Sequence, residues 1–360
     1  MKFGLGLYGN MLNTSNFRFA RQAGATHIVA HVVGHFNTAD VKNATVSRQD
    51  LGWGASVPDP NSWTYEWMRD MRAAANAEGL ELEAIENFEP GHWYDVLLDG
   101  PRKREQMETL KRIIRDMGRA GIAVMGYNFS ITGVWGRDSG AAARGGAGTV
   151  GFHAPDQPPI PRGMVWNMVY DPDIYDPQGR HGTLPPISRE ELLQRYAWFL
   201  NELVPVAEEA NVRLALHPDD PPVPTLRGAA RLVYQPRQYK EILAIKPSHH
   251  HAMELCLGTV GEMSEGDIYE LVDRHSQREE IAYIHFRNVK GKVPHYDEVF
   301  IDEGDVDMVR LLRILHKNNY AGVLIPDHTP SMDCEAPWHA GMAYALGYMR
   351  AAIQIISSGG

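Results

Sequence analysis

The sequence predicts an α/β fold, and within that class a (β/α)8 TIM barrel. Eight short apolar runs alternate with eight longer amphipathic segments along the chain. Such alternation is typical of a parallel sheet that eight units close into a barrel. The length of 360 residues suits a barrel with insertions, since these folds extend from about 200 to more than 400 residues. An open doubly wound sheet is the rival fold, but no G-x-G-x-x-G motif or phosphate-binding loop follows the first apolar run.

The first half of the chain supplies four strand candidates and three helix candidates. Continuous or alternating apolar runs predict strands at residues 2–8, 26–32, 80–85 and 122–129. Apolar residues at helical spacing predict helices at residues 14–23, 62–78 and 102–119. Gly121 follows the third helix, at a position where a glycine commonly ends a helix.

The second half supplies four further strands and five helices. The strands are predicted at residues 212–217, 252–258, 281–286 and 322–326. The helices are predicted at residues 188–210, 237–245, 264–275, 305–317 and 338–356. Ser188 with Glu191 has the spacing of a capping box, and Ser264 with Asp267 indicates another helix start. Because no linker separates two halves, we expect one domain over residues 1–360.

The residues in excess of a minimal barrel fall in long loops after the second and fourth strands. The segment 130–188 is rich in Gly, Pro, Asp and Arg and has little periodicity. Loops of this length inside a compact fold are usually functional. We therefore expect a lid over the site or a contact between subunits, with a flexible excursion that has no role as the alternative.

Composition excludes several classes of function. The formal net charge of -10 gives no positive field for a phosphate backbone, so nucleic acid is not an expected partner. No apolar run approaches the ~18 residues of a membrane helix, and the N-terminus lacks the pattern of a signal peptide. Two cysteines cannot build a disulfide framework. We expect a soluble, cytoplasmic protein, in which 16 histidines make metal or acid–base chemistry worth seeking.

Polar side chains stand at the ends of four consecutive strand candidates. They are His217, Cys256, His285 and Asp327. Because the C-terminal strand ends of a barrel converge on its active site, these side chains are expected to meet there. Imidazole, thiolate and carboxylate together can bind a divalent transition ion, whereas a lone buried cysteine or histidine is usually structural. Ligand softness alone favours Zn²⁺ or Fe²⁺ over Mn²⁺.

Further polar and aromatic side chains are expected around the same mouth. Arginine can hold a carboxylate with two bonds, and an amide suits a hydroxyl group. The predicted substrate-binding residues are Asn128, Trp135, Arg137, Arg287 and Lys290. Ordinary surface charge and core packing are the alternatives. Glu86 closes the third strand as an inward-pointing candidate, and if buried it would need a partner. His249, His250 and His251 precede the sixth strand, at the opposite end, where we expect a solvated turn.

Several of these segments resemble the mannonate dehydratase family. The resemblance is carried by HPDDPP at 217–222, ELCLG at 254–258, IHFRNVK at 284–290 and IPDH at 325–328, with YNF at 127–129 and WGR at 135–137. It implies a TIM-barrel hydro-lyase that converts D-mannonate into 2-dehydro-3-deoxy-D-gluconate in hexuronate breakdown. It also implies Mn²⁺, or Fe²⁺, at His217, Cys256, His285 and Asp327, so that Zn²⁺ becomes the less favoured ion. A homo-oligomer is implied as well, with a dimer as the first expectation.

Two segments depart from the family's pattern. The chain reads ENFEPGH at 86–92, in place of the V-H-E-type stretch of close members. After Asp327 and His328 the family has a loop with a catalytic tyrosine, whereas here His339 lies near the equivalent position and Tyr344 falls in the last helix. A different acid, or a different sugar acid as substrate, is therefore open.

Dehydration of a 2,3-dihydroxy acid needs two proton-transfer groups. A base takes the proton beside the carboxylate, and an acid protonates the departing hydroxyl. We expect His328 to be one of them, Asp327 to orient the site, and His339 or a tyrosine from elsewhere to be the other. The main rival function is a metal-dependent sugar isomerase or epimerase, although Cys256 counts against it. A sugar-acid binding homologue without the acid–base pair is the third hypothesis.

Overall fold

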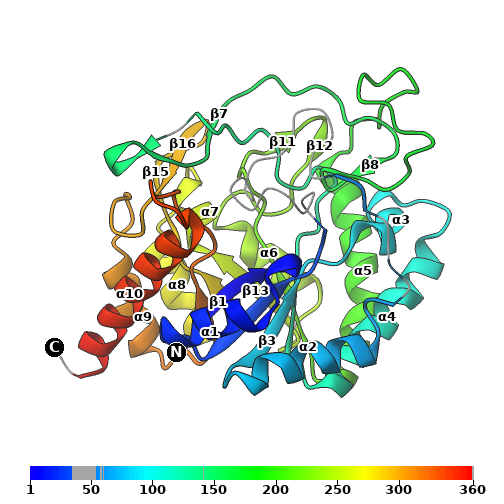
Figure 1. Ribbon diagram of the computed structural model, residues 1–360. Helices are drawn as coiled ribbons and strands as arrows, with labels where there is room; N and C mark the ends of the chain where they lie inside the picture. The colour runs from blue at the N-terminus through cyan, green and yellow to red at the C-terminus, as the bar shows by residue number, and fades with distance from the viewer. Residues whose placement is uncertain (35–53, 57–58, 60, 141, 359–360) are drawn as a thin grey trace.

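The computed structural model describes residues 1–34, 54–56, 59, 61–140 and 142–358, and within them eight parallel strands close into a barrel (Figure 1). Around the barrel the strands follow the order β1, β17, β14, β13, β10, β4, β3 and β2. Successive strands are therefore neighbours and the last pairs with the first, as short right-handed crossovers require. The predicted TIM barrel is confirmed. Most of the predicted loop after the second strand lies outside the described residues.

The barrel strands coincide with the eight predicted ones to within a few residues. They are β1 (Lys2–Tyr8), β2 (His27–His31), β3 (Glu81–Glu86), β4 (Val124–Tyr127), β10 (Arg213–Leu216), β13 (His251–Cys256), β14 (Ile281–His285) and β17 (Val323–Ile325). The register aligns their polar ends, because Tyr8 lies opposite His31, and Cys256 lies opposite His285. Polar groups from different strands thus lie at one level at the mouth of the barrel.

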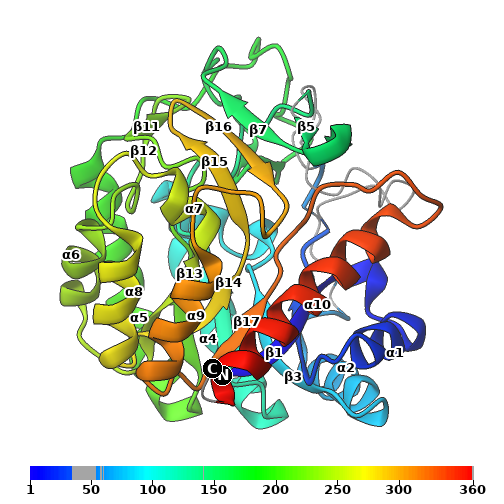
Figure 2. The same cartoon turned by 90° about the vertical axis from the view of Figure 1, so that its left-hand side faces the viewer.

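An outer ring of helices covers the barrel (Figure 2). The predicted helices are α1 (Thr14–Gln22), α2 (Tyr65–Ala77), α4 (Lys103–Ala120), α5 (Arg189–Ala210), α6 (Gln238–Ile245), α8 (Ile268–Gln277), α9 (Met308–Lys317) and α10 (Pro337–Ser357). The capping box of Ser188 and Glu191 is present. The helix α8 begins four residues later than predicted, because the Asp267 carboxylate, not Ser264, caps the helix. Two short helices were not predicted, α3 (Tyr94–Leu98) and α7 (Leu257–Glu262).

Small side chains fill the interior of the barrel around one large one. Ala84, Ala215 and Ala252 pack there with Tyr283. A Cβ atom on Gly126 would lie 2.0 Å from the hydroxyl oxygen of Tyr283, so only glycine fits beside this phenol. The hydroxyl group in turn donates to Oε2 of Glu86 at 3.0 Å. The packed interior thereby supports the polar mouth above it.

The segment 130–188 and a β-hairpin after β14 build a small sheet over the barrel. The hairpin, which was not predicted, consists of β15 (Asn288–Lys292) and β16 (His295–Val299). The segment 130–188 contains β5 (Ala142–Ala143), β6 (Ala147–Gly148), β7 (Gly151–His153), β8 (Met164–Val165) and β9 (Met168–Val169), while β11 (Thr225–Leu226) and β12 (Ala229–Ala230) follow β10. Strand β7 pairs antiparallel with β16 (Figure 2). Among the described helices, none has both the length and the apolar character that a bilayer crossing needs.

Candidate metal and acid–base site

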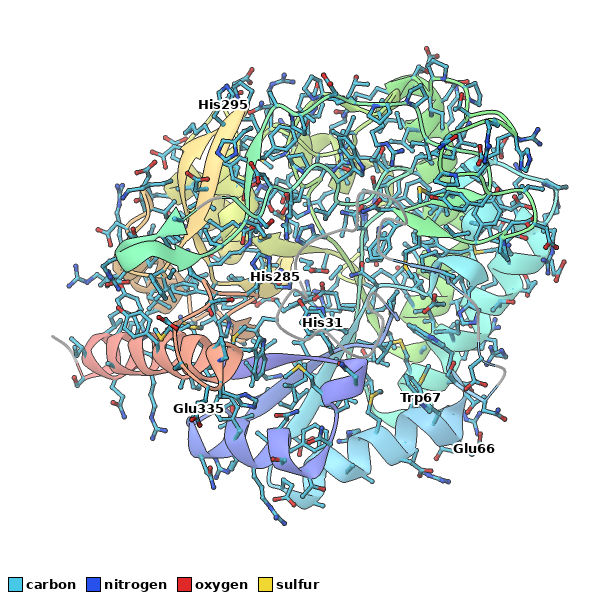
Figure 3. All side chains as sticks on the ribbon, turned by 45° about the horizontal axis from the view of Figure 1, so that its top comes forward. His31, Glu66, Trp67, His285, His295 and Glu335 are labelled. Carbon is cyan, nitrogen blue, oxygen red and sulfur yellow. The ribbon has the colours of Figure 1, made fainter. Side chains whose placement is uncertain are left out.

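Three of the four predicted metal ligands come together at the mouth of the barrel. One ligand atom each of His217, Cys256 and His285 lie within 4.8 Å of one another. Cys256 and His285 end adjacent strands, and His217 directly follows β10. The side chain of His285 points to the centre of the mouth, close to that of His31 (Figure 3). Soft and borderline donors at this separation suit a divalent transition ion.

Hydrogen bonds fix one nitrogen of each histidine and leave the other for a ligand. Nδ1 of His217 lies 2.5 Å from the carbonyl oxygen of Pro218, so it carries a proton and Nε2 is the nitrogen left to face a ligand. Nε2 of His285 lies 3.0 Å from Oε2 of Glu86, whereas its Nδ1 is buried and makes no hydrogen bond. Metal-ligating histidines typically show this arrangement, with the second nitrogen held by a carbonyl or carboxylate.

The fourth predicted ligand, Asp327, lies beside the other three. Its Oδ2 atom is 3.5 Å from Nδ1 of His285 and 3.1 Å from Nε2 of His328. Burial acts to raise the pKa of Asp327, but the charges of His328 and His285 outweigh it and hold the pKa well below its usual range. The carboxylate is therefore ionised and faces the orphaned imidazole nitrogen.

The charge state of Cys256 also suits a ligand. Burial acts to raise the pKa of the Cys256 thiol, but the charge of Arg287 and the neighbouring imidazoles of His217 and His285 outweigh it and lower that pKa well below its usual range. Burial likewise opposes protonation of His217, yet its hydrogen bond to Cys256 raises its pKa to about 9. The thiolate is the form of cysteine that binds metals. Cys256 also accepts a bond from the backbone N–H of Thr259 at 3.4 Å, in the first turn of α7.

A buried carboxylate pair supports the imidazoles from below. Glu86 was singled out as needing a partner, and it has two, since Oε1 lies 3.3 Å from Nδ1 of His31 and Oε2 contacts His285. Glu254, which was not predicted, places Oε1 3.2 Å from Nε2 of His285. Burial and the charge of Glu86 raise the pKa of Glu254 well above its usual range. The pair therefore holds one negative charge and one neutral carboxyl group.

Arg287 and Arg137 lie at the mouth, but the structure changes their expected role. Arg287 is 3% exposed. Its guanidinium group lies 2.8 Å from both Asp220 and Glu262 and 3.2 Å from Asp327. Arg137 is bound to Asp220 at 2.6 Å. Both are predicted to bind the substrate, and here protein carboxylates occupy most of their donors. In this structure the two guanidinium groups neutralise the buried carboxylates of Asp220 and Glu262.

His328 is held between two carboxylates. Its Nδ1 lies 2.5 Å from Oε2 of Glu298, a residue of β16, and its Nε2 lies 3.1 Å from Asp327. Burial acts to lower the pKa of His328, but the charges of Asp327 and Glu298 outweigh it and raise that pKa to about 9. At neutral pH the imidazole is therefore charged and can donate a proton.

Other predicted substrate-binding residues are placed less centrally. Asn128 is 5% exposed, and its Oδ1 is buried without a hydrogen bond, so an acceptor is available near the mouth. Trp135 instead lies under Arg227, whose guanidinium carbon is 5.0 Å from the ring centroid. The side chain of Lys290 is exposed on β15 and lies 3.9 Å from Glu303. Lys290 therefore lies apart from the buried charged side chains of the mouth.

His339 does not join His328. Its Nε2 lies 3.0 Å from Oδ1 of Asn16, and its ring packs edge-on against Phe19 and Trp338. These contacts join α10 to α1 on the outside of the barrel, so the structure does not bring His339 to His328, and its catalytic role stays a prediction. His339 is close to His328 in sequence, which is why the two were expected to meet. However, α10 begins two residues before His339, so this side chain packs between helices.

The histidine run before β13 lies at the opposite end, as predicted, but it is not a simple solvated turn. His249 lines a cavity of about 720 Å³ at that end. His251 is 3% exposed, and its two ring nitrogens lie 3.0 Å from the carbonyl of Lys246 and 3.0 Å from the hydroxyl of Tyr196. This histidine is therefore part of the core.

Sequence reasoning missed four buried residues of the mouth: His31, Glu254, Glu262 and Glu298. A signal exists for His31, which ends the second predicted strand as His285 ends the seventh. Glu254 stands alone among apolar neighbours in a strand. Glu298 belongs to a hairpin with no apolar alternation, so no pattern in the sequence indicates it.

Comparison with known proteins agrees with this geometry. A family model described as D-mannonate dehydratase (UxuA) matches residues 1–356. The mannonate dehydratase of Lactococcus lactis subsp. lactis (strain IL1403) is 26% identical over an alignment of 295 residues that covers 77% of this chain and 82% of the relative. The mannonate dehydratase of Streptococcus pneumoniae (strain 70585) is 28% identical over 280 residues, 76% of each chain.

Solved structures share the fold. The crystal structure of mannonate dehydratase from Streptococcus suis serotype2 superimposes with a TM-score of 0.76 at 22% identity, covering 100% of this chain and 96% of that one. A D-tagatose 3-epimerase-like protein gives a TM-score of 0.58 at 14% identity, covering 99% of both chains. These likenesses support the barrel, while the family model spans nearly the whole sequence. The chain belongs to the D-mannonate dehydratase (UxuA) family.

Proposed function

We propose that the chain is a metal-dependent hydro-lyase that removes water from a sugar acid, with D-mannonate as substrate and 2-dehydro-3-deoxy-D-gluconate as product. Membership of the family supports the reaction. The observation that carries the proposal is the grouping of His217, Cys256 and His285 within 4.8 Å, beside a charged imidazole at His328. Together they offer a metal site and a proton donor in one buried mouth.

The donor set fits a divalent transition ion. His217, Cys256, His285 and Asp327 are proposed to hold it, and the orphaned Nδ1 of His285 supports that assignment. We propose Mn²⁺ as the resident ion and Fe²⁺ as the next choice, with Zn²⁺ less favoured, on the strength of the family. Such an ion, when bound, stabilises negative charge that develops on oxygen atoms of a substrate carboxylate and its neighbouring hydroxyl.

The chain's own residues would handle the proton. His328 lies next to Asp327 and turns Nε2 toward it, so this nitrogen is the one placed to exchange a proton at the mouth. Because this imidazole is charged at neutral pH, we propose that it protonates the departing hydroxyl. Asn128, with a buried unpaired acceptor, is proposed to bind a substrate hydroxyl.

Arg137 is proposed to assist in binding despite its ion pairs. Its Nη1 lies 3.3 Å from Nε2 of His328, and its Nε is buried without a hydrogen bond. Arg287 is proposed to act on the substrate only through the carboxylates that it orients. Trp135 and Lys290 stay as weaker predictions, because their contacts lead away from the buried group.

The segment 130–188 is proposed to wall the site, within one domain that spans residues 1–360. Its β7 pairs with β16, and Arg137 at its start reaches Asp220. A lid and a contact between subunits both stay open as its further role. We also propose a cytoplasmic homo-oligomer, with a dimer as first choice, and light scattering of the purified protein would test the mass.

The decisive experiment incubates purified protein with Mn²⁺ and a panel of aldonic acids, and assays 2-keto-3-deoxy products. We expect product from D-mannonate and none from a Cys256→Ala variant, which loses the thiolate. A keto product without loss of water would establish the rival, a sugar isomerase or epimerase. Tight binding without any product would establish a binding protein instead.

A further inference from the structure

We propose that Glu298 is a positioning residue for His328, which fixes the proton on Nδ1 and so presents Nε2 to the substrate. The inference rests on the proposed function, since it names the group that orients the proposed proton donor. Nothing in the sequence pattern pointed to Glu298, and the role follows from its contacts alone.

The contact between the two side chains is direct and buried. Nδ1 of His328 lies 2.5 Å from Oε2 of Glu298, and their side chains are 11% and 4% exposed. A carboxylate can only accept a hydrogen bond, so Nδ1 must carry the proton. The remaining nitrogen, Nε2, lies 3.1 Å from Asp327 and 3.3 Å from Nη1 of Arg137, and it therefore faces the proposed metal and substrate site.

Two guanidinium groups keep Glu298 in place. Its Oε1 atom lies 3.3 Å from Nη2 of Arg137 and 3.3 Å from Nη1 of Arg287. These cations favour the carboxylate form and restrict rotation of the side chain, because each is also bound to Asp220. The two oxygens of Glu298 thus have separate tasks, one toward the arginines and one toward the imidazole.

The segment 130–188 completes this arrangement. Its β7 pairs with β16 so that Phe152 lies opposite Tyr296 and Gly151 opposite Asp297, one residue from Glu298. The segment also supplies Arg137. Alternation along β16 turns Asp297 outward, where its side chain is 39% exposed and lies 3.1 Å from His153. Neighbouring acids on one strand therefore have opposite environments, which provides a matched control.

The test compares Glu298→Gln and Glu298→Asp with Asp297→Asn in the metal-loaded enzyme. We expect Glu298→Gln to lower kcat by about 10²–10⁴-fold, the range for loss of a carboxylate that orients a catalytic imidazole and stabilises its charged form. KM and metal content should change less than about threefold. Glu298→Asp keeps the acceptor and should recover part of kcat, whereas Asp297→Asn should match the wild type.

A second readout does not depend on turnover. In protein with ¹⁵N-labelled histidine, the His328 signals, assigned by their absence in His328→Asn, should report a proton on Nδ1 in the wild type and a changed distribution in Glu298→Gln. An unchanged ¹⁵N pattern, or equal losses in Glu298→Gln and Asp297→Asn, would overturn the inference. If the wild type turns over no sugar acid, the proposed function fails, while the ¹⁵N measurement still decides whether Glu298 sets the proton. Should Glu298→Gln not fold, the comparison of Glu298→Asp with the wild type decides in its place.

Discussion

Oε2 of Glu86 lies 3.0 Å from Nε2 of His285, and the register of the barrel brings them together although 199 residues separate them in sequence. The bond leaves Nδ1 of His285 free for another partner. Burial acts to raise the pKa of Glu86, but His31 and His285 lower it well below its usual range. An ionised acceptor thus orients a predicted metal ligand from behind.

Replacing Glu86 by Gln should weaken metal binding. An outer carboxylate that orients a ligating histidine typically contributes 10–100-fold in affinity, so we expect a loss of about that size for Mn²⁺. Competition titration against a metal indicator measures it. Glu81→Gln is the control, since Glu81 lies on the same strand, is exposed, and has its carboxylate 3.2 Å from Arg72. Equal affinities of the two variants would contradict the assignment of Glu86.

Replacing His328 by Asn should abolish most turnover while metal content stays intact. Removing a proton donor typically costs about 10²–10⁴-fold in rate. The contrasting variant is His339→Asn, which the structure places against Asn16 and which should keep its kcat. Steady-state kinetics and elemental analysis check both. If His339→Asn were inactive and His328→Asn active, the original assignment of His339 would be restored.

His251 should make stability depend on pH. Burial lowers its pKa to about 4, below the unfolded value of ~6.5. The neutral form is thus favoured in the folded state, and its contribution is present above pH ~6.5 and lost as the pH falls toward 4. That contribution reaches at most about 3 kcal/mol. Urea unfolding at several pH values measures it, and His251→Gln should flatten the dependence over this window.

Replacing Gly126 by Ala should destabilise the barrel. The added Cβ would lie 2.0 Å from the hydroxyl oxygen of Tyr283 and 2.5 Å from Oε2 of Glu254. Overpacking of this kind typically costs about 1–3 kcal/mol in the free energy of unfolding. Thermal unfolding should show a lower Tm. Gly148→Ala, where no atom lies within 4 Å of the new carbon, should leave Tm unchanged.

The barrel was predictable because its periodicity is local. Each strand and each predicted helix carries its own apolar pattern. The capping box at Ser188 is a local signal of the same kind, because it lies within four residues of the chain. The strand-end rule likewise brought His217, Cys256 and His285 to one place. Periodicity cannot predict which charged side chains form ion pairs with one another. For this reason the sequence suggested Arg287 as a substrate-binding residue, whereas its guanidinium group is paired with Asp220 and Glu262.

The hairpin and the small strands of 130–188 escaped prediction for a related reason. Their residue types do not alternate between apolar and polar, because inward positions of β16 such as Glu298 carry polar side chains. Tertiary contact, not local preference, holds such segments. The role of Glu298 can therefore be recognised only from the tertiary structure, in which β7 pairs with β16 and Glu298 contacts His328.

Closure of the barrel has a consequence for biosynthesis. Strand β1 is made first, but its partner β17 follows near the end of translation, with Lys2 opposite Val323. Until then one edge of β1 is open, and open edges are templates for joining other chains. We expect nascent molecules to rely on chaperones during this interval, and a ribosome that stops before Ile325 to release aggregating material instead of a partly active enzyme.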